Sequence, residues 1–278
     1  MPVELPPAFA FSQSSLQDFA DCPRRFQLRY LLGQAYPAPL GRPLASLDRS
    51  LERGERFHRL MERCWRGIQL PERVDPLVAD LWQAFCANPP PDVPQAFRRV
   101  EFSVNVKPSW ANGARLTAKY DLLAYDPDGG ALIVDWKTAR RPPRAALERR
   151  LQTVLYPLLL VEAAPSLFGT ALPPERVTLL YWFGEDGGAT ERFTYDSESY
   201  AADRAYISAL LARLNALDAA EFPLTADLRH CRACQYRALC GREQVSGTFE
   251  PEDTDLFPDL DELRELIAAA AASDDFVL

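Results

Sequence analysis

Apolar residues in the first third of the chain recur every three or four positions, which predicts helices. Ser12 or Ser14 is a suitable N-cap for a helix that runs to about Leu32. After a proline-rich loop, the same spacing predicts helices over 46–66 and over about 73–87. Three consecutive prolines then end the third helix, because proline cannot continue a helix.

The pattern changes to alternation in the middle of the chain, which predicts strands. Residues 98–106 and 114–125 alternate between apolar and polar side chains, with many β-branched and aromatic residues. The sequence Asp-Pro-Asp-Gly-Gly at 126–130 is a strong turn signal, and 131–136 is a third strand. We expect these strands to form an antiparallel meander.

The remaining elements give the fold class. In order, we expect a helix over about 144–163, strands over 176–183 and 190–195, a helix over 197–217 and a loop over 222–241. This order predicts an α/β fold, in which a mixed central sheet is flanked by helices.

Composition and charge place the chain among ordinary globular proteins. It has 278 residues, of which 47% are hydrophobic, and its net charge is −8 at pH 7. Ten acidic residues and one basic residue lie in 250–278, so the rest of the chain is almost neutral. This balance excludes a broad phosphate-binding surface but allows a local basic groove. The sequence has no evident signal peptide or membrane-spanning stretch, so we expect a cytoplasmic protein without a membrane partner.

The sharpest chemical feature is an acid and a lysine at the end of the third strand. Asp135 and Lys137 are two residues apart, so they project from the same face of a strand. Alone, such an acid and lysine are more often an ordinary surface pair on an exposed edge strand. Asp121 on the preceding strand changes this view, since pairing across the 126–130 turn brings it to the end of the third strand. Two carboxylates on adjacent strands form a minimal site for Mg²⁺ or Mn²⁺.

These residues belong to a larger set that resembles a known family. Gln152 and Tyr156 lie one helical turn apart on the helix that follows the third strand. Together the motifs resemble the RecB-like branch of the PD-(D/E)XK nucleases, which includes AddB-type nuclease domains and CRISPR-associated spacer-acquisition exonucleases. The resemblance covers roughly residues 11–241. The matching motifs are Gly54-x-x-x-His58, Asp121, Asp135-Trp136-Lys137 and Gln152-x-x-x-Tyr156.

The resemblance implies a PD-(D/E)XK fold with a helical N-terminal insertion, and a role for each matching residue. His58, Asp121 and Asp135, with the Trp136 carbonyl, would hold one or two divalent ions. Lys137 would position or help to deprotonate the attacking water. Gln152 and Tyr156 would contact DNA or brace the site. Ala118 stands where the family often has glycine, which affects local backbone fit rather than chemistry.

The cysteines form a second constellation near the C-terminal end. Cys231, Cys234 and Cys240 form a C-x2-C-x5-C array, and Cys22 is the natural fourth ligand. Zinc is one interpretation of such an array. A single distant cysteine with this triplet instead resembles AddB-type nucleases, which implies a 4Fe–4S cluster that ties the two ends of the chain together. The remaining cysteines, Cys64 and Cys86, are expected to be core thiols.

These features predict one nuclease domain over residues 1–249, followed by an acidic tail at 250–278. The domain would include a helical insertion at 46–97 and the Fe–S-binding loop at 222–241. The expected function is metal-dependent hydrolysis of DNA, as an exonuclease on single strands or ends, in repair, recombination or CRISPR adaptation. The alternative is a DNA-end-binding or assembly subunit whose nuclease site is unused. The chain has no Walker-type glycine loop, so any helicase partner is a separate protein.

Candidate contacts to DNA follow from basic and aromatic residues around these motifs. Arginines are dense after Lys137 and around Cys22, and such clusters suit contacts to the phosphate backbone. They are Arg140, Arg141, Arg144, Arg149 and Arg150, and Arg24, Arg25 and Arg29. Three aromatic residues, Trp110, Tyr120 and Trp136, are candidates either for base stacking or for the core.

Overall fold

The computed structural model describes residues 5–34, 44–218, 221–232 and 234–245, with side chains from residue 49 onwards in the second range. The predicted acidic tail at 250–278 lies outside the described residues. The chain divides into two compact units. We call residues 43–207 the sheet unit, and residues 1–42 with 208–278 the cysteine unit; each is described by itself.

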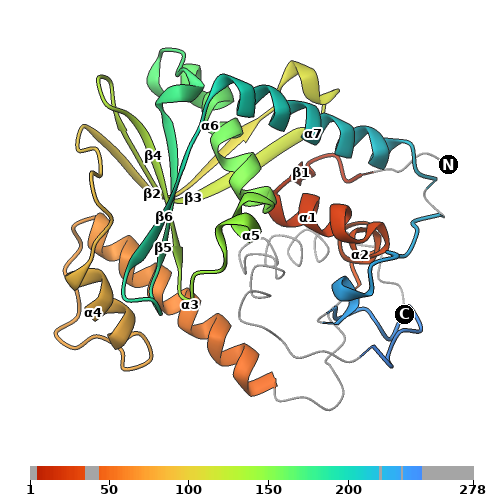
Figure 1. Cartoon of the computed structure of the whole chain (residues 1–278), viewed down its shortest axis with the longest axis horizontal. Coiled ribbons are helices and arrows are strands. Elements are labelled where there is room, and N and C mark those ends of the chain that lie inside the picture. Colours follow the sequence, from red (N-terminus) through yellow and green to blue (C-terminus); the bar gives the residue numbers. More distant parts are fainter. Residues whose placement is uncertain (1–4, 35–43, 219–220, 233, 246–278) are drawn as a thin grey trace. The chain divides into compact units, whose positions relative to one another are not determined.

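The sheet unit is built on a mixed sheet (Figure 1). Its strands are β2 (Phe97–Val106), β3 (Arg115–Asp126), β4 (Gly130–Lys137), β5 (Val177–Phe183) and β6 (Ala189–Thr194). They lie in the order β2-β3-β4-β5-β6, and only the β4–β5 pair is parallel. The predicted meander and the mixed central sheet are both confirmed.

The predicted turn between β3 and β4 is fixed by its aspartate and its last glycine. A carboxylate oxygen of Asp126 accepts hydrogen bonds from the amides of Asp128 and Gly129, at 2.8 and 3.1 Å. Gly130 has a φ of 96°, and a Cβ there would lie 2.4 Å from the carbonyl oxygen of Arg176. Glycine is therefore required by both the backbone conformation and the close approach of the neighbouring chain.

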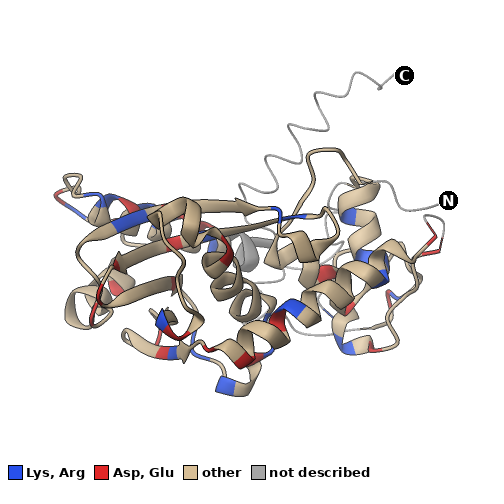
Figure 2. Ribbon diagram, turned by 90° about the horizontal axis from the view of Figure 1, so that it is seen from above, with Lys and Arg blue, Asp and Glu red and all other residues tan. Residues whose placement is uncertain are grey.

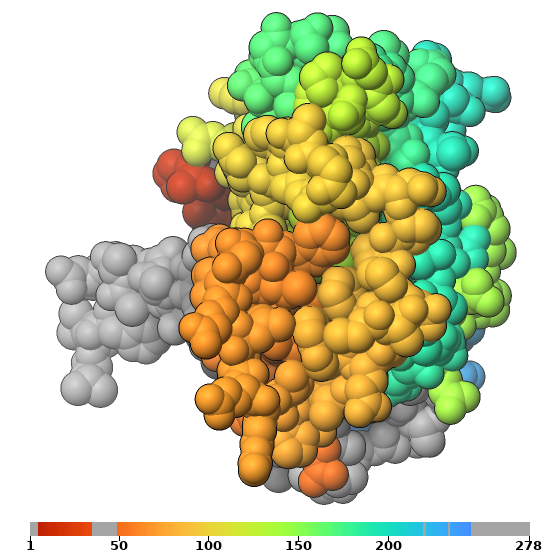
Figure 3. Space-filling view, turned by 90° about the vertical axis from the view of Figure 1, so that its left-hand side faces the viewer, coloured from red at the N-terminus to blue at the C-terminus, as the bar shows by residue number. Residues whose placement is uncertain are grey.

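One face of the sheet is covered by α3 (Leu44–Trp65) and α4 (Ala79–Ala87), which lie side by side in Figure 3. Phe57 of α3 stacks on Trp182 of β5, with ring centroids 5.5 Å apart. Phe85 of α4 packs edge-on against Trp136 of β4 at 5.9 Å. The apolar stripes of both helices thus close one half of the core. Helix α4, predicted over about 73–87, begins later, at Ala79, because the preceding residues form turns and bends.

The other face carries α5 (Arg144–Glu148) and α6 (Leu151–Phe168), where one helix over 144–163 was predicted. Helix α6 contacts β2, β3 and β5. It is long and apolar enough to cross a membrane by length and composition alone, which the sequence analysis overlooked. Ten of its residues are buried inside the protein, and this packing accounts for its apolar character. The 3₁₀ turns η2 (Ser109–Ala111) and η3 (Pro174–Arg176) complete the connections.

The cysteine unit begins with β1 (Ala10–Phe11) and a broken helix rather than the predicted continuous one. Helix α1 (Gln13–Asp21) starts at Ser12, whose side chain and that of Ser15 form a capping box. The helix stops at Cys22 because Pro23 disfavours helical geometry in the residue before it. It resumes as α2 (Pro23–Phe26) and the π-helix η1 (Gln27–Leu31). Helix α7 (Ser197–Asn215) spans both units, and η4 (Leu228–Cys231) begins the cysteine array.

Two of the arginines predicted to contact DNA are instead buried in this unit. Arg25 pairs with Asp18 at 2.7 Å and with Asp21 at 2.7 Å, and Arg29 pairs with the other oxygen of Asp18. Burial alone would lower the pKa of Arg25, but the two carboxylates raise it above its ordinary value. The prediction of phosphate contacts is therefore wrong for Arg25 and Arg29, which hold α1 to the segment after it.

Candidate active site

The end of strand β4 gathers the predicted motif residues in the sheet unit. The pairing of Leu122 with Val134 places Asp121 beside the end of β4. A carboxylate oxygen of Asp121 accepts a hydrogen bond from the Trp136 amide at 2.7 Å. Asp121 is 7% exposed and its orientation is fixed by the backbone of the neighbouring strand. The proximity expected from the 126–130 turn is therefore present.

Asp135, Lys137 and Gln152 form a closed network on one face of β4. The Lys137 ammonium lies 3.0 Å from one carboxylate oxygen of Asp135 and donates to the Gln152 side-chain carbonyl at 2.9 Å. The Gln152 amide donates to the other oxygen of Asp135. Trp136 projects from the opposite face into the core, as strand alternation requires. Gln152 thus bridges the acid and the base and fixes their relative position.

Tyr156 lies beneath this network, one turn along α6. Its ring packs edge-on against Tyr120 at 5.2 Å, and the Tyr120 hydroxyl donates to the Tyr156 carbonyl oxygen at 3.0 Å. Burial raises the pKa of Tyr156 well above its ordinary value, and Asp135 and Asp121 add to the shift. The phenol therefore stays protonated. Since it is only 3% exposed, its position fits bracing of the site.

His58 reaches the site from α3 with its two ring nitrogens turned to different partners. Nε2 lies 3.1 Å from the Trp136 carbonyl oxygen, and Nδ1 lies 3.4 Å from a carboxylate oxygen of Asp121. Burial lowers the pKa of His58, but Asp121 and Glu101 raise it well above the ordinary value. The positively charged form of the His58 imidazole is therefore favoured. The Trp136 carbonyl, predicted to be a ligand, is the partner of His58 here.

Glu101 of β2 is a site residue that the sequence analysis missed. Its Oε1 lies 3.6 Å from His58 Nδ1, and its Oε2 lies 3.1 Å from the Lys119 ammonium. Burial would raise the pKa of Glu101, but His58 and Lys119 hold it below the ordinary value. His58, Glu101 and Asp121 each offer a ligand atom, and these atoms lie within 4.8 Å of one another.

This group of three fits a divalent cation. The Glu101 Oε1 atom is buried and has no hydrogen-bond partner among the described residues. A buried carboxylate oxygen without a donor is costly unless a cation satisfies it. Carboxylates are ligands for Mg²⁺ and Mn²⁺, and imidazole is a common ligand for first-row transition metals. The residues present therefore suit the metal ion that the motifs imply.

The backbone around Glu101 and Asp121 departs from regular strand geometry. The register places these residues opposite each other, yet they are not paired, while Val100 pairs with Leu122 and Phe102 with Tyr120. Glu101 has a φ of 50°, in a region that side chains other than glycine rarely adopt. Such irregularities cost about 1–3 kcal/mol and concentrate at functional sites. Here the irregularity lies between two of the three candidate ligands.

The alternation of side chains also changes at Asp121. Tyr120 packs on α6, whereas Leu122 belongs to the core on the α3 and α4 face. On a regular strand, residues two apart would share a face. The change turns Asp121 towards both β4 and His58. It is the local feature that joins α3 and the sheet in one site.

The basic and aromatic candidates around the site divide into two groups. Arg141 and Arg144 pair with Glu191, and Tyr120 and Trp136 are buried in the core, so neither aromatic ring is available for base stacking. Arg140 and Arg149 are exposed, and each lies three residues in sequence from a residue of the network, Lys137 and Gln152 respectively. Lys and Arg are interspersed with Asp and Glu along the described ribbon (Figure 2). A few exposed arginines are therefore the candidates that remain for contacts to phosphate.

The cysteine array is brought together in the cysteine unit. Cys22, Cys231, Cys234 and Cys240 line one pocket, although Cys22 is more than 200 residues away from the others in sequence. Burial raises the pKa of Cys234 and of Cys240 above the ordinary thiol value. A metal bound there would displace their protons. Of the two expected core thiols, Cys64 is half-buried and Cys86 is exposed, so the prediction is wrong for Cys86.

The mixed sheet with carboxylates and a lysine on neighbouring strands defines a nuclease fold of the metal-dependent class. A model of the PD-(D/E)XK nuclease superfamily matches residues 10–92 and 85–241. The chain therefore belongs to the PD-(D/E)XK nuclease superfamily, whose nucleases use divalent metal ions. No curated protein matches it.

The chain is similar to two solved structures. An Eubacterium rectale protein named "putative exonuclease" is 11% identical, with a TM-score of 0.53, and the match covers 87% of this chain and 90% of that one. A protein named SSO0001 is 15% identical, with a TM-score of 0.45, and the match covers 85% of this chain and 88% of that one. The likeness to the Eubacterium rectale protein, at 11% identity, concerns the fold alone.

Proposed function

We propose that this protein is a metal-dependent DNA nuclease of the RecB-like branch, acting as an exonuclease on single-stranded DNA or DNA ends. The observation that carries the proposal is the arrangement at β4. The Asp135–Lys137–Gln152 network stands beside the His58–Glu101–Asp121 group, so acid ligands and a fixed ammonium meet in one site. A subunit with an unused site has no need to keep both sets.

The catalytic roles follow from these contacts. His58, Glu101 and Asp121, with Asp135 and the second lone pair of the Trp136 carbonyl oxygen, would hold one or two Mg²⁺ or Mn²⁺ ions. Such an ion polarises a phosphoryl oxygen and lowers the pKa of water. Lys137, held by Asp135 and Gln152, is placed to orient the attacking water and to stabilise negative charge on the phosphate. Tyr156 keeps Gln152 and Asp135 in position from below.

The substrate class follows from the charges near the site. Arg140 and Arg149 are exposed and suited to phosphate contacts, which carry no base sequence information. Lys and Arg are interspersed with Asp and Glu along the described ribbon (Figure 2), and the net charge of the whole chain is −8. We therefore favour short, sequence-nonspecific contacts, as with a strand end. A helicase or another repair or CRISPR protein, acting as a separate partner, would supply that end.

The four cysteines are proposed to hold a 4Fe–4S cluster. Their common pocket and the C-x2-C-x5-C spacing support a four-thiolate site, and the resemblance to AddB-type nucleases favours iron over zinc. Such a cluster would join Cys22 to the 231–240 segment and complete a nuclease domain over residues 1–249. Reduced cysteine ligands and a DNA substrate together favour a cytoplasmic location. Iron, sulfide and zinc analysis of anaerobically purified protein separates the two metals.

The test of the function is Mn²⁺-dependent cleavage of end-labelled single- and double-stranded DNA. We expect the wild type to shorten DNA from an end and K137A to lose at least a thousandfold in rate, because the ammonium at the site is gone. K107A removes an exposed lysine of the same unit and should cleave like the wild type. An iron-loaded, folded wild type that binds DNA ends without cutting them would overturn the proposal in favour of an end-binding subunit.

A further inference from the structure

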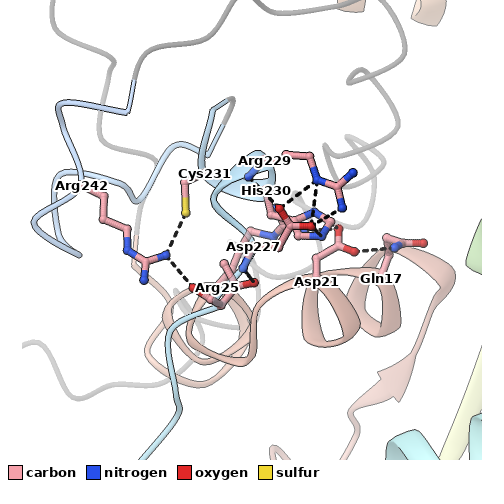
Figure 4. A network of polar contacts seen from close by, with 9 residues as sticks. Gln17, Asp21, Arg25, Asp227, Arg229, His230, Cys231 and Arg242 are labelled. Atoms are coloured by element: carbon pink, nitrogen blue, oxygen red, sulfur yellow. Dashed lines mark hydrogen bonds and ion pairs between the residues drawn. The ribbon is translucent and has the colours of Figure 1, made fainter.

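A guanidinium group lies directly against the cysteine pocket. Arg242 lines this pocket with the four cysteines, and its Nη1 donates a hydrogen bond to the Cys231 sulfur at 3.1 Å (Figure 4). The same nitrogen donates to the Thr225 carbonyl oxygen at 2.8 Å. The backbone contact holds the side chain in place, so that its charge is directed to the sulfur. A guanidinium group keeps its proton in proteins, so Arg242 carries a positive charge here.

Arg25, a buried cation of the same pocket, differs from the partly exposed Arg242 in its partners. Arg25 also lines the pocket, but it pairs with Asp18 and Asp21, so its charge is compensated by two carboxylates. Arg242 forms no ion pair with a carboxylate within the described residues. Its uncompensated positive charge is thus directed to the thiol groups of Cys231 and its neighbours.

A charge in this place has a definite effect on a four-thiolate iron–sulfur group. Such a group is anionic, and it becomes more negative when a one-electron reductant adds an electron, with no bond made or broken and no proton required. Hydrogen bonds to the sulfurs and nearby positive charge stabilise the more negative state. Both raise the reduction potential, and Arg242 supplies both to Cys231.

We propose that Arg242 tunes the reduction potential of the group held by Cys22, Cys231, Cys234 and Cys240, by donating a hydrogen bond and a positive charge to the Cys231 sulfur. This inference rests on the proposed 4Fe–4S cluster. Arg242 is a positioning and tuning residue, and DNA hydrolysis in the sheet unit does not pass through it.

The test is a redox titration of the iron-loaded protein, followed by its electron paramagnetic resonance signal, with dithionite as the reductant. We expect R242Q to lower the ratio of reduced to oxidised cluster at a fixed potential by at least threefold, a shift of about 28 mV at 59 mV per tenfold. R232Q is the matched control. Arg232 follows Cys231 directly but is exposed, so its charge is screened by solvent and the potential should stay near the wild-type value.

The outcomes distinguish this inference from the proposed cofactor. Wild-type protein that contains no iron after anaerobic purification would refute the cluster itself. Iron-loaded R242Q with the potential of R232Q, or with a higher one, would overturn the role of Arg242 while leaving the cluster in place. If R242Q loses its iron, R242K decides, because lysine keeps the charge but loses the two-point contact. Its potential should fall below that of R232Q, and a value at or above it would overturn the proposal.

Discussion

The two units of this chain hold their candidate ligands in opposite ways. In the sheet unit, the ligands project from α3, β2, β3 and β4, whose positions are set by a hydrogen-bonded sheet and a closed apolar core. In the cysteine unit, three of the four cysteines lie in 221–245, where η4 (Leu228–Cys231) is the regular element among the described residues. The fold of the sheet unit positions the candidate ligands of that unit. In the cysteine unit, metal binding is expected to contribute to folding.

Electrostatics shows the same contrast. At the candidate nuclease site, Asp121 and Glu101 raise the pKa of His58, so a positively charged imidazole is favoured close to both acids. In the cysteine unit, burial raises the pKa of Cys234 and Cys240, which keeps those sulfurs neutral until a metal replaces the protons. We therefore expect metal to bind the first site with little change of structure, and the second with a large gain in stability.

Removal of a ligand of the proposed 4Fe–4S cluster should have the largest effect on this contrast. We expect C234S to lose its iron and its brown colour, and to unfold the cysteine unit, because metal–thiolate sites contribute on the order of 10 kcal/mol to folding. Iron content, visible absorbance and limited proteolysis measure the result. C64S, which removes a thiol of the sheet unit, is the control. Full iron content in C234S would contradict the assignment of this ligand.

The buried ion pairs of the cysteine unit should come next in size. D18A leaves Arg25 and Arg29 without a shared carboxylate, and removal of one partner from a buried pair costs about 3–5 kcal/mol. Urea unfolding of the iron-loaded protein measures the loss. D80A is the control, since Asp80 is 63% exposed and its pair with Arg53 should contribute less than about 1 kcal/mol. Equal effects of the two variants would show that Asp18 is not structural.

The missed glutamate provides a test of the preformed metal site. We expect E101Q to weaken Mn²⁺ binding about 10–100-fold, the loss typical when one partner of a metal site is removed. Calorimetric titration of the folded protein measures the affinity. E198Q changes an exposed glutamate of the same unit and should bind like the wild type. Unchanged affinity in E101Q would remove Glu101 from the ligand set.

Asp203, a half-buried acid outside the candidate site, should give the smallest effect, with a defined pH dependence. Burial raises the pKa of Asp203 to about 6, although the Tyr195 hydroxyl donates to it at 2.9 Å. Because the folded pKa lies above the unfolded one, wild-type stability is lost as pH rises from about 4 to about 6. D203N has no such loss and should be more stable by about 1–2 kcal/mol at pH 8, after allowance for partial exposure. Urea unfolding should show this advantage vanish near pH 4.

The sequence predicted the sheet unit well because its signals are local. Strand alternation and the 126–130 turn fix the β3–β4 register, and that register places Asp121 beside the end of β4. Glu101 was missed because it belongs to no motif and its role depends on pairing with a distant strand. Symmetric pairing of the two predicted strands across their loop would have placed it near 119–121, which was the available signal.

The arginines of the cysteine unit show the opposite limit. Arg25 and Arg29 read as basic DNA contacts, yet Asp18 stands seven and eleven residues before them. On a helix these spacings fall on one face, so the pairing could have been anticipated. The break at Cys22 could have been anticipated as well, because Pro23 disfavours helical geometry in the residue before it. The π-helix that follows could not, because it depends on how the segment packs. The candidate ligands of this unit could therefore be predicted from the sequence, whereas the packing around them could not.

Hydrogen exchange of the iron-loaded and iron-stripped protein tests the central claim most directly, namely that the fold builds the nuclease site while the metal builds the cysteine unit. The account predicts that loss of iron removes amide protection from residues 13–31 and 221–245, while β3 and β4 keep theirs. Mn²⁺ binding should then still occur at wild-type affinity. Loss of protection in β3 and β4, together with loss of Mn²⁺ binding, would contradict the account, because the nuclease site would then depend on the cluster.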